Sequence, residues 1–375
     1  MPIRVVCLFV CISFIVPFLS LGCKGTNINI SAESAIVMIA GTGEVLYEKN
    51  AYEERGIAST TKIMSSLVAL ESGKLKRETV ATKRDVTIEG TSIGLKDGDS
   101  INLVTLVKGM LLESGNDAAN VTATLVAGNK ESFVALMNKK AKELGMNNTS
   151  FRNPSGLTED GHYSTAYDMA LLASEAIRNP VFREITSSRA VRVSMGTPAY
   201  SRTFYNHNKF LNMYDGALGI KTGFTKASGR CLVTAAQRDG VTLVAVTLKA
   251  PNDWQDHKKL MDYAFSNIKK EKVTVDLSMY KIPVVGSKKE NISGELMCEL
   301  EIPYSEQLPE YSVVCFIPQF LYAGIKKGDY IGWVEIQTAN GGLINKSYIV
   351  SCEDAEEMKA SDKKGTFIEK LKNIF

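Results

Sequence analysis

The sequence of 375 residues is poor in the side chains on which several common kinds of site depend. It contains only three histidines, which lack the spacing of metal ligands, and its seven cysteines include no Cys-x-x-Cys pair. Neither sign of charge dominates, since 44 Lys and Arg residues face 41 Asp and Glu residues for a net charge of +3. No basic tract interleaved with aromatic residues is present. The sequence therefore predicts no metal, no cofactor and no nucleic-acid partner.

The N-terminus has the pattern of an export signal. Arg4 supplies a positive charge, residues 5–21 are almost wholly apolar, and polar sequence begins at Lys24. We therefore expect a signal peptide over residues 1–23 and a mature protein at the extracytoplasmic face of the cell membrane. Two alternatives remain open. The apolar run could be retained as an anchor, or cleavage could leave Cys23 as a lipidated N-terminus.

The pattern over residues 27–270 predicts an α+β domain in which helices flank an antiparallel sheet. The dipeptide Asp239-Gly240 predicts a tight hairpin, and the nearly continuous apolar run after it predicts a strand covered by helices on both faces. The expected strands are residues 35–40, 45–47, 217–222, 230–236 and 241–246. The expected helices are residues 57–70, 102–112, 117–126, 132–144, 165–177 (ended by Pro180) and 256–265.

Helical periodicity disappears after the run of lysines at residues 269–272. Short strand-like segments follow, some of them separated by Gly-Asp and Asn-Gly-Gly turns. We expect a small all-β domain over residues 272–352, with strands at residues 273–276, 295–302, 312–316, 330–337 and 347–352.

Residues 361–375 form a predicted amphipathic tail. Its apolar side chains share one helical face: Phe367, Ile368, Leu371, Ile374 and Phe375. Because the tail is terminal and carries several lysines, we expect it to bind a membrane surface. The alternative is a terminal helix that packs on its own domain.

Three short motifs occur in one order along the predicted α+β domain. They are Ser59-Thr60-Thr61-Lys62, Ser114-Gly115-Asn116 and Lys221-Thr222-Gly223. Each alone is a weak signal, because an exposed helix start or an ordinary turn could carry it. Together they supply the groups that serine acyl transfer needs when no histidine acts as the base.

Ser59 and Lys62 lie three residues apart at the start of a predicted helix, so their side chains share one face. A serine hydroxyl is a poor nucleophile until a neighbour takes its proton, and Lys62 can take it only when neutral. Burial and a second nearby cation, for which Lys221 is the candidate, both favour the neutral amine. The motif predicts Ser59 as the nucleophile and Lys62 as its base.

Ser114 and Asn116 lie between two predicted helices. The hydroxyl of Ser114 can pass a proton between Lys62 and a leaving nitrogen. The amide of Asn116 both donates and accepts, which suits a substrate peptide group.

The third motif ends a predicted strand. Lys221 and Thr222 side by side can hold a carboxylate, and Gly223 lets a substrate backbone lie against the strand. The backbone N–H of Phe224 can pair with that of Ser59 as an oxyanion hole.

These residues resemble those of the penicillin-binding serine D-Ala-D-Ala carboxypeptidases of low molecular mass, within the serine β-lactamase and transpeptidase group. The resemblance extends to residues 56–64, 153–157, 161–170 and 206–208. It implies a β-lactamase/transpeptidase-like fold. It also implies that Ser59 attacks the bond between the last two D-alanines of a peptidoglycan stem pentapeptide. D-alanine would leave, water would hydrolyse the acyl-enzyme, and β-lactams would trap Ser59 as a stable ester.

One segment departs from the family pattern. Many relatives carry an arginine after the last sheet strand, where it helps to hold the substrate carboxylate, but residues 251–256 contain none. Recognition of the carboxylate would then lean more on Lys221, or turnover would be reduced.

Three other functions fit parts of the pattern. A β-lactamase would use the same nucleophile, but no dedicated glutamate for fast deacylation is identifiable. A non-catalytic envelope protein could bind wall peptides in the same pocket, although it would have little need of intact Ser59, Lys62 and Lys221. A transpeptidase would pass the acyl group to an amine.

Overall fold

The computed structural model describes residues 28–358. The predicted signal peptide (residues 1–23) and the predicted tail (residues 361–375) lie outside the described residues. Within them, an α+β arrangement with an antiparallel sheet is followed by a region of strands, which confirms the fold class expected from the sequence.

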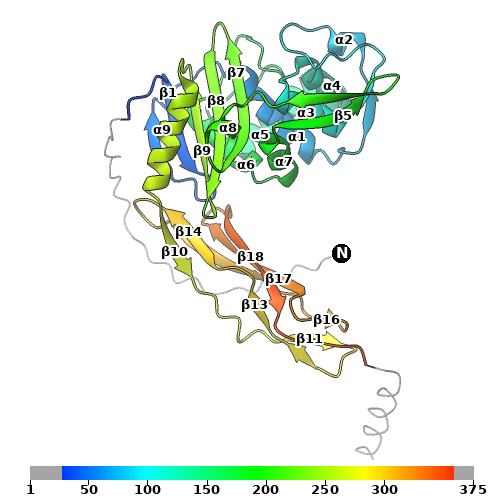
Figure 1. Cartoon of the computed structure of the whole chain (residues 1–375), viewed down its shortest axis with the longest axis vertical. Helices are drawn as coiled ribbons and strands as arrows, with labels where there is room; N and C mark the ends of the chain where they lie inside the picture. The colour runs from blue at the N-terminus through cyan, green and yellow to red at the C-terminus, as the bar shows by residue number, and fades with distance from the viewer. Residues whose placement is uncertain (1–27, 359–375) are drawn as a thin grey trace, which may run out of the picture.

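The main sheet is antiparallel and has the strand order β2-β1-β9-β8-β7. Its strands are β1 (Ser34–Ile39), β2 (Val45–Lys49), β7 (Ala217–Thr225), β8 (Gly229–Arg238) and β9 (Val241–Leu248). Asp239 and Gly240 both have positive φ and form the turn between β8 and β9, as predicted. Strand β9 is buried at all but one of its positions because helices cover both faces of the sheet (Figure 1).

Helix α9 (Asp253–Ser266) covers one face of this sheet, where Leu260 and Met261 pack with Val37 and Leu243. A larger set of helices covers the other face and shares a core that includes Ile63. This set consists of α1 (Lys62–Glu71), α3 (Leu103–Leu112), α4 (Asn116–Ala127), α5 (Lys130–Glu143), α6 (Ala166–Ala176) and α7 (Pro180–Ser187). Helix α1 is buried from Lys62 to Leu70, so the lysine of the first motif lies in the interior.

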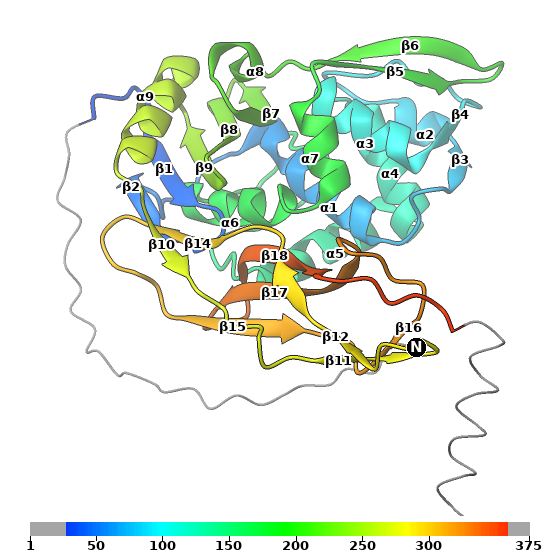
Figure 2. The same ribbon diagram turned by 60° about the horizontal axis from the view of Figure 1, so that its bottom comes forward.

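Several smaller elements complete this part of the chain. They are β3 (Glu78–Val80), α2 (Lys83–Val86), β4 (Ser100–Asn102), β5 (Ala190–Met195), β6 (Tyr200–Tyr205) and α8 (Phe210–Met213). The hairpin β5–β6, which the sequence did not predict, runs along the side of the helical layer near α3 (Figure 2). The sequence suggested that Pro180 ends the helix expected over residues 165–177, but in the structure Pro180 begins the next helix, α7. It occupies the first turn of α7, where a missing N–H costs nothing, and Asn179 caps that helix.

From Lys269 onward the described chain contains strands and no helix. The strands are β10 (Lys269–Val273), β11 (Ile282–Val285), β12 (Asn291–Ile292), β13 (Gly294–Leu296), β14 (Leu300–Tyr304), β15 (Tyr311–Phe316), β16 (Leu321–Tyr322), β17 (Tyr330–Thr338) and β18 (Leu343–Ser351). The single strand expected over residues 295–302 is two strands, β13 and β14, which pair with different partners.

The strand region meets the first part of the chain at the β1–β2 hairpin. The carboxylate of Glu44 accepts hydrogen bonds from the backbone N–H groups of Ser305 and Glu306, at 3.0–3.1 Å. The far end of the region carries β11 and β16, close to the point where the described chain ends (Figure 1). No helix within residues 28–358 is long and apolar enough to cross a bilayer.

Candidate active site

Ser59 lies in a 3₁₀ turn, Ala58–Thr61, that leads directly into helix α1. Two side chains lock this turn: the Thr60 hydroxyl donates to the carbonyl of Ile57 (2.6 Å) and the Thr61 hydroxyl to that of Ala58 (2.8 Å). Ser59 and Lys62 therefore lie on the same side of the chain, as the spacing predicted. The Lys62 Nζ is 2.9 Å from the Ser59 Oγ.

The amine of Lys62 has two other polar contacts, both with acceptors. It lies 2.7 Å from the Oδ1 of Asn116 and 2.6 Å from the carbonyl oxygen of Ser155. A neutral amine has two N–H bonds and one lone pair. When these two acceptors take both N–H bonds, the lone pair is directed at the hydroxyl of Ser59. The geometry is therefore complete for an amine that accepts the proton of Ser59.

Burial and charge favour that neutral form. Lys62 has no solvent exposure. Its burial, together with the positive charge of Lys221, lowers the pKa of Lys62 well below its usual value, and the carboxylate of Asp117 opposes this shift. Lys221 is itself buried, and burial lowers its pKa to about 7.

The second motif enters the site at the start of helix α4. The amide of Asn116 is oriented by its other group, since its Nδ2 donates to the carbonyl of Glu89 (2.8 Å) while its Oδ1 faces Lys62. Ser114 is buried and has a positive φ of 62°, and its hydroxyl makes no hydrogen bond to another described residue. The sequence predicted Asn116 as a clamp for substrate. In the structure its carbonyl is already engaged by Lys62.

Asp117 holds a loop beside this motif. Its carboxylate accepts hydrogen bonds from the backbone N–H groups of Ile93 (2.9 Å) and Leu95 (3.0 Å) and from the hydroxyl of Ser92 (2.5 Å). With the backbone N–H of Ala118 (2.8 Å) the carboxylate has four donors, and the three from residues 92–95 fix that loop against the start of helix α4.

A tight turn supplies the carbonyl of Ser155 that contacts Lys62. The Oδ1 of Asn153 accepts from the backbone N–H groups of Ser155 (3.2 Å) and Gly156 (2.8 Å). Gly156 has a φ of +83°, and a Cβ there would lie 1.9 Å from the carbonyl oxygen of Ala58. Only glycine permits this approach to the nucleophile turn.

His162 fastens the same turn from the other side. Its Nδ1 accepts from the backbone N–H of Arg152 (3.1 Å), so its Nε2 carries the proton and donates to the Thr61 hydroxyl at 2.8 Å. Burial lowers the pKa of His162 to about 4, which keeps the ring neutral near pH 7. Asn153 and His162 fall in segments that resemble the family, but their spacing gave no sign of these contacts.

The third motif lies on β7, the edge strand of the sheet. A Cβ on Gly223 would lie 3.1 Å from the backbone nitrogen of Ser59, so the absent side chain lets the strand pass beside the nucleophile. Lys221 Nζ donates to the carbonyl of Thr222 (3.0 Å). His207 lies 3.6 Å from the carboxylate of Glu113. Burial, with a further contribution from the charge of Lys221, lowers the pKa of His207, and Glu113 opposes this shift.

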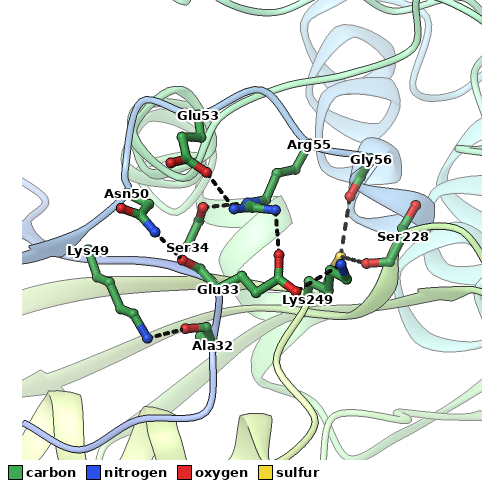
Figure 3. Close-up of polar contacts among 11 residues, drawn as sticks. Ala32, Glu33, Ser34, Lys49, Asn50, Glu53, Arg55, Gly56, Ser228 and Lys249 are labelled. Atoms are coloured by element: carbon green, nitrogen blue, oxygen red, sulfur yellow. Dashed lines mark hydrogen bonds and ion pairs between the residues drawn. The ribbon is translucent and has the colours of Figure 1, made fainter.

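The segment before the nucleophile is tied to the sheet by polar contacts (Figure 3). Arg55 donates to the Ser34 hydroxyl (2.6 Å) and to the carboxylate of Glu33 (2.7 Å). Gly56 follows, and its carbonyl accepts from the thiol of the buried Cys231 at 3.6 Å. These contacts fix the direction from which the chain enters the Ser59 turn.

The segment that lacks the family arginine carries a satisfied carboxylate. Asp253 begins helix α9 and forms an ion pair with Arg230 of strand β8 at 2.9 Å. Arg230 pairs with Phe224 and directly precedes Cys231 in strand β8. The side chain of Cys231 lies in the core on the face of the sheet that also carries Lys221. Successive side chains alternate between faces, so Arg230 points to the α9 face, away from Lys221.

Comparison with known proteins gives these residues a family. A model of the D-alanyl-D-alanine carboxypeptidase family, Peptidase_S11, matches residues 23–252. Since this match covers more than half of the chain, the protein belongs to that family of D-alanyl-D-alanine carboxypeptidases.

Individual relatives agree with this assignment. The chain is 38% identical over 245 residues to the D-alanyl-D-alanine carboxypeptidase DacF of Bacillus subtilis, which covers 63% of this chain and 62% of that protein. It is 32% identical over 353 residues to DacC of Escherichia coli, covering 88% of this chain and 85% of DacC. The second alignment therefore includes much of the strand region.

Solved structures show the same fold. A D-alanyl-D-alanine carboxypeptidase of Mycobacterium tuberculosis superposes with a TM-score of 0.60 at 34% identity, over 64% of this chain and 94% of that one. A DD-transpeptidase of Streptomyces K15 gives a TM-score of 0.62 at 32% identity, over 64% of this chain and all of the other.

Proposed function

We propose that this protein is a serine-type D-alanyl-D-alanine carboxypeptidase that removes the terminal D-alanine from peptidoglycan stem pentapeptides through an acyl-enzyme. The observation that carries the proposal is the contact of 2.9 Å between the Lys62 amine and the Ser59 hydroxyl, in surroundings that lower the pKa of the lysine. Family membership supports the reaction, and the resemblance described above supplies the substrate class.

In the first step the Ser59 Oγ attacks the carbonyl carbon of the penultimate D-alanine, and the hydroxyl proton moves to the neutral Nζ of Lys62. The backbone N–H groups of Ser59 and Phe224 stabilise the oxyanion that forms. The C–N bond then breaks, and the leaving nitrogen receives a proton from Lys62 through the hydroxyl of Ser114. The products are free D-alanine and an ester on Ser59, which water hydrolyses.

Asn116 orients Lys62 in this scheme, and its remaining amide N–H is available to the substrate. Lys221 and Thr222 hold the terminal carboxylate of the substrate, and Gly223 leaves room for the substrate backbone beside strand β7. A β-lactam would acylate Ser59 by the same route and remain as a stable ester.

Mass spectrometry tests the proposal. The chain without its predicted leader is incubated with a stem pentapeptide and, separately, with penicillin. We expect free D-alanine from the first and a covalent adduct on Ser59 from the second. Ser59→Ala should abolish both, whereas Ser72→Ala, at the other end of helix α1, should preserve both. Labelling that survives Ser59→Ala would show that the nucleophile is another residue.

The same experiment separates the alternatives. A penicillin adduct that is lost within seconds would identify a β-lactamase. Transfer of the acyl group to an added amine would identify a transpeptidase. Peptide binding without any released D-alanine would identify a non-catalytic protein.

The proposed organisation of the chain places the catalytic domain outside the cell membrane. It comprises a signal peptide (residues 1–23), the catalytic domain (residues 27–270), the all-β domain (residues 272–352) and a tail (residues 361–375) that binds the membrane surface. Peptidoglycan lies outside that membrane, which supports export.

A further inference from the structure

The far end of the strand region carries a small cluster of exposed apolar side chains, which we call the tip patch: Pro283, Val285, Phe320 and Tyr322. Val285 is 52% exposed, Phe320 47% and Tyr322 71%. They lie on or beside strands β11 and β16, which pair in parallel and set Val285 opposite Tyr322. The rings of Phe320 and Tyr322 meet edge to face at 5.5 Å.

The tip patch belongs to a folded sheet with a buried face. Ile282, Val284 and Ile292 of the same small sheet are buried in the core of the strand region. Strand β11 alternates strictly between buried and exposed positions, so Pro283 and Val285 share the outer face. The fold thus presents four apolar side chains to solvent on a supported surface.

The C-terminal segment of the described chain is attached at this place. The backbone N–H of Met358 donates to the carbonyl of Gly286 (2.8 Å), directly after Val285. The carbonyl of Ala355 accepts from the backbone N–H of Gly324 (2.7 Å), two residues after Tyr322. The described chain therefore ends beside strands β11 and β16, which Figure 1 shows, and so beside the tip patch.

We propose that the tip patch inserts into the membrane surface and forms a second attachment beside the tail. This inference rests on the membrane attachment proposed for residues 361–375. Eight residues, 359–366, separate Met358 from Phe367. The nine residue steps from Met358 to Phe367 span at most about 32 Å, so a tail in the bilayer interface holds the tip patch close to the same surface.

The side chains of the tip patch suit a lipid surface better than a protein partner. The ring of Tyr322, apolar with a polar hydroxyl, favours the boundary between headgroups and acyl chains. The ring of Phe320 has no polar atom and suits the apolar side of that boundary. A stable protein interface needs about 800 Å² on each partner, which four side chains do not provide. Durable attachment to a membrane takes two signals. The tip patch would supply the second signal and so strengthen the membrane binding of the short amphipathic tail.

The first experiment measures binding of the chain without its predicted leader to vesicles of equal parts phosphatidylcholine and phosphatidylglycerol. We expect the double variant Phe320→Ser, Tyr322→Ser to lower the partition coefficient by about tenfold. Tyr311→Ser is the matched control. Tyr311 is also an exposed aromatic residue of the strand region, but it lies outside the tip patch, at the start of β15, where it pairs with Thr338. Release of D-alanine from a soluble pentapeptide should be the same for the double variant, for Tyr311→Ser and for the unaltered chain. Unchanged binding by the double variant would overturn the proposal.

A second experiment reads insertion directly. Tryptophan fluorescence of Tyr322→Trp should shift to shorter wavelength on vesicles and be quenched by lipids brominated in their acyl chains, whereas Tyr311→Trp should not respond. Equal responses at the two positions would overturn the proposal. So would self-association without vesicles that the double variant abolishes, since the patch would then bind a second copy of the chain.

The two proposals fail separately. If deletion of Phe367–Phe375 leaves vesicle binding unchanged while the double variant lowers it, the tail attachment is wrong and the tip patch stands. If the deletion abolishes binding and the double variant does not change it, the reverse holds.

Discussion

Burial together with the positive charge of Lys221 lowers the pKa of Lys62, although Lys221 lies on the edge strand β7 and Lys62 at the start of helix α1. Each lysine is buried, so neither charge is screened by water. In the proposed mechanism the two lysines therefore have different tasks: Lys62 is neutral and accepts a proton, and Lys221 holds the carboxylate of the substrate.

Removal of the Lys62 amine should slow acylation without unfolding the protein. We expect Lys62→Ala to reduce the rate of acylation by a fluorescent penicillin by about 10²–10⁴-fold, the usual contribution of positioned proton transfer. Lys140→Ala, which removes a lysine that pairs with Glu71 away from the site, is the control. A Lys62→Ala rate within a few-fold of the wild type would remove Lys62 from the role of base.

The pH dependence of kcat/KM should be bell-shaped. As the pH falls, Lys62 gains a proton and can no longer accept one from Ser59, so the rate falls on the acid side. As the pH rises above about 7, Lys221 loses the charge that holds the substrate carboxylate, so the rate falls on the alkaline side. A bound carboxylate raises the pKa of Lys221, and the alkaline loss should therefore occur at higher pH for kcat than for kcat/KM.

Two controls isolate the contribution of Lys221. Lys221→Met should abolish the alkaline limb together with most of the affinity for substrate. A pentapeptide with a C-terminal carboxamide should also lack that limb. The assignment is wrong if the carboxamide substrate loses activity over the same pH range as the acid.

Substitution of Gly156 should impair both folding and acylation, although Gly156 contributes no side chain to the site. Gly156→Ala places a Cβ 1.9 Å from the carbonyl oxygen of Ala58 and so displaces the turn that holds Ser59. We expect a loss of about 3 kcal/mol in the free energy of unfolding, or more, and acylation slowed by at least tenfold. Gly145→Ala is matched, since Gly145 has a φ of +73° with nothing near its Cβ position.

Thermal unfolding and penicillin acylation of both glycine variants provide the comparison. Gly145→Ala should cost only about 1–2 kcal/mol, the strain of a left-handed alanine, and leave acylation unchanged. Equal effects of the two substitutions would mean that the contact with Ala58 does not position the nucleophile.

Deletion of Phe367–Phe375 should release the processed protein from membranes, because these residues carry the apolar face of the predicted tail. Fractionation of cells that express the shortened chain measures this. Cys23→Ser is the companion variant. A membrane fraction that the deletion leaves unchanged and Cys23→Ser abolishes would show that lipidation, and not the tail, attaches the protein.

The sequence predicted those parts of the site that depend on side chains at short spacing. The separation of Ser59 and Lys62 is a helical spacing, and the structure joins them at 2.9 Å. The sequence did not predict the carbonyl of Ser155 as a contact of Lys62, because every residue has a backbone carbonyl and the residue type does not reveal its role. The same holds for His162, whose role depends on contacts made across the fold.

The strands likewise include some that the sequence predicted and some that it did not. Strands β8 and β9 were predicted because both are strongly apolar and a favoured turn joins them. The hairpin β5–β6 was not, since much of it is polar or exposed. The core contacts of Val193, Met195 and Phe204 that hold it against the helices appear only in the folded chain. Strand β11 is apolar at all four positions and β16 has only two residues, so neither shows an alternation of apolar and polar residues in the sequence.

The edge position of β7 has a consequence for the order of events during synthesis. Lys221 has no place beside Lys62 until β8 and β9 have joined β7 to the rest of the sheet, because β7 pairs with β8 alone. A nascent chain that ends before Leu248 therefore lacks the assembled pair of amines. Under the proposed mechanism we expect such a chain to react with neither wall peptides nor penicillin, so that covalent labelling by penicillin would count only molecules in which the catalytic domain has folded.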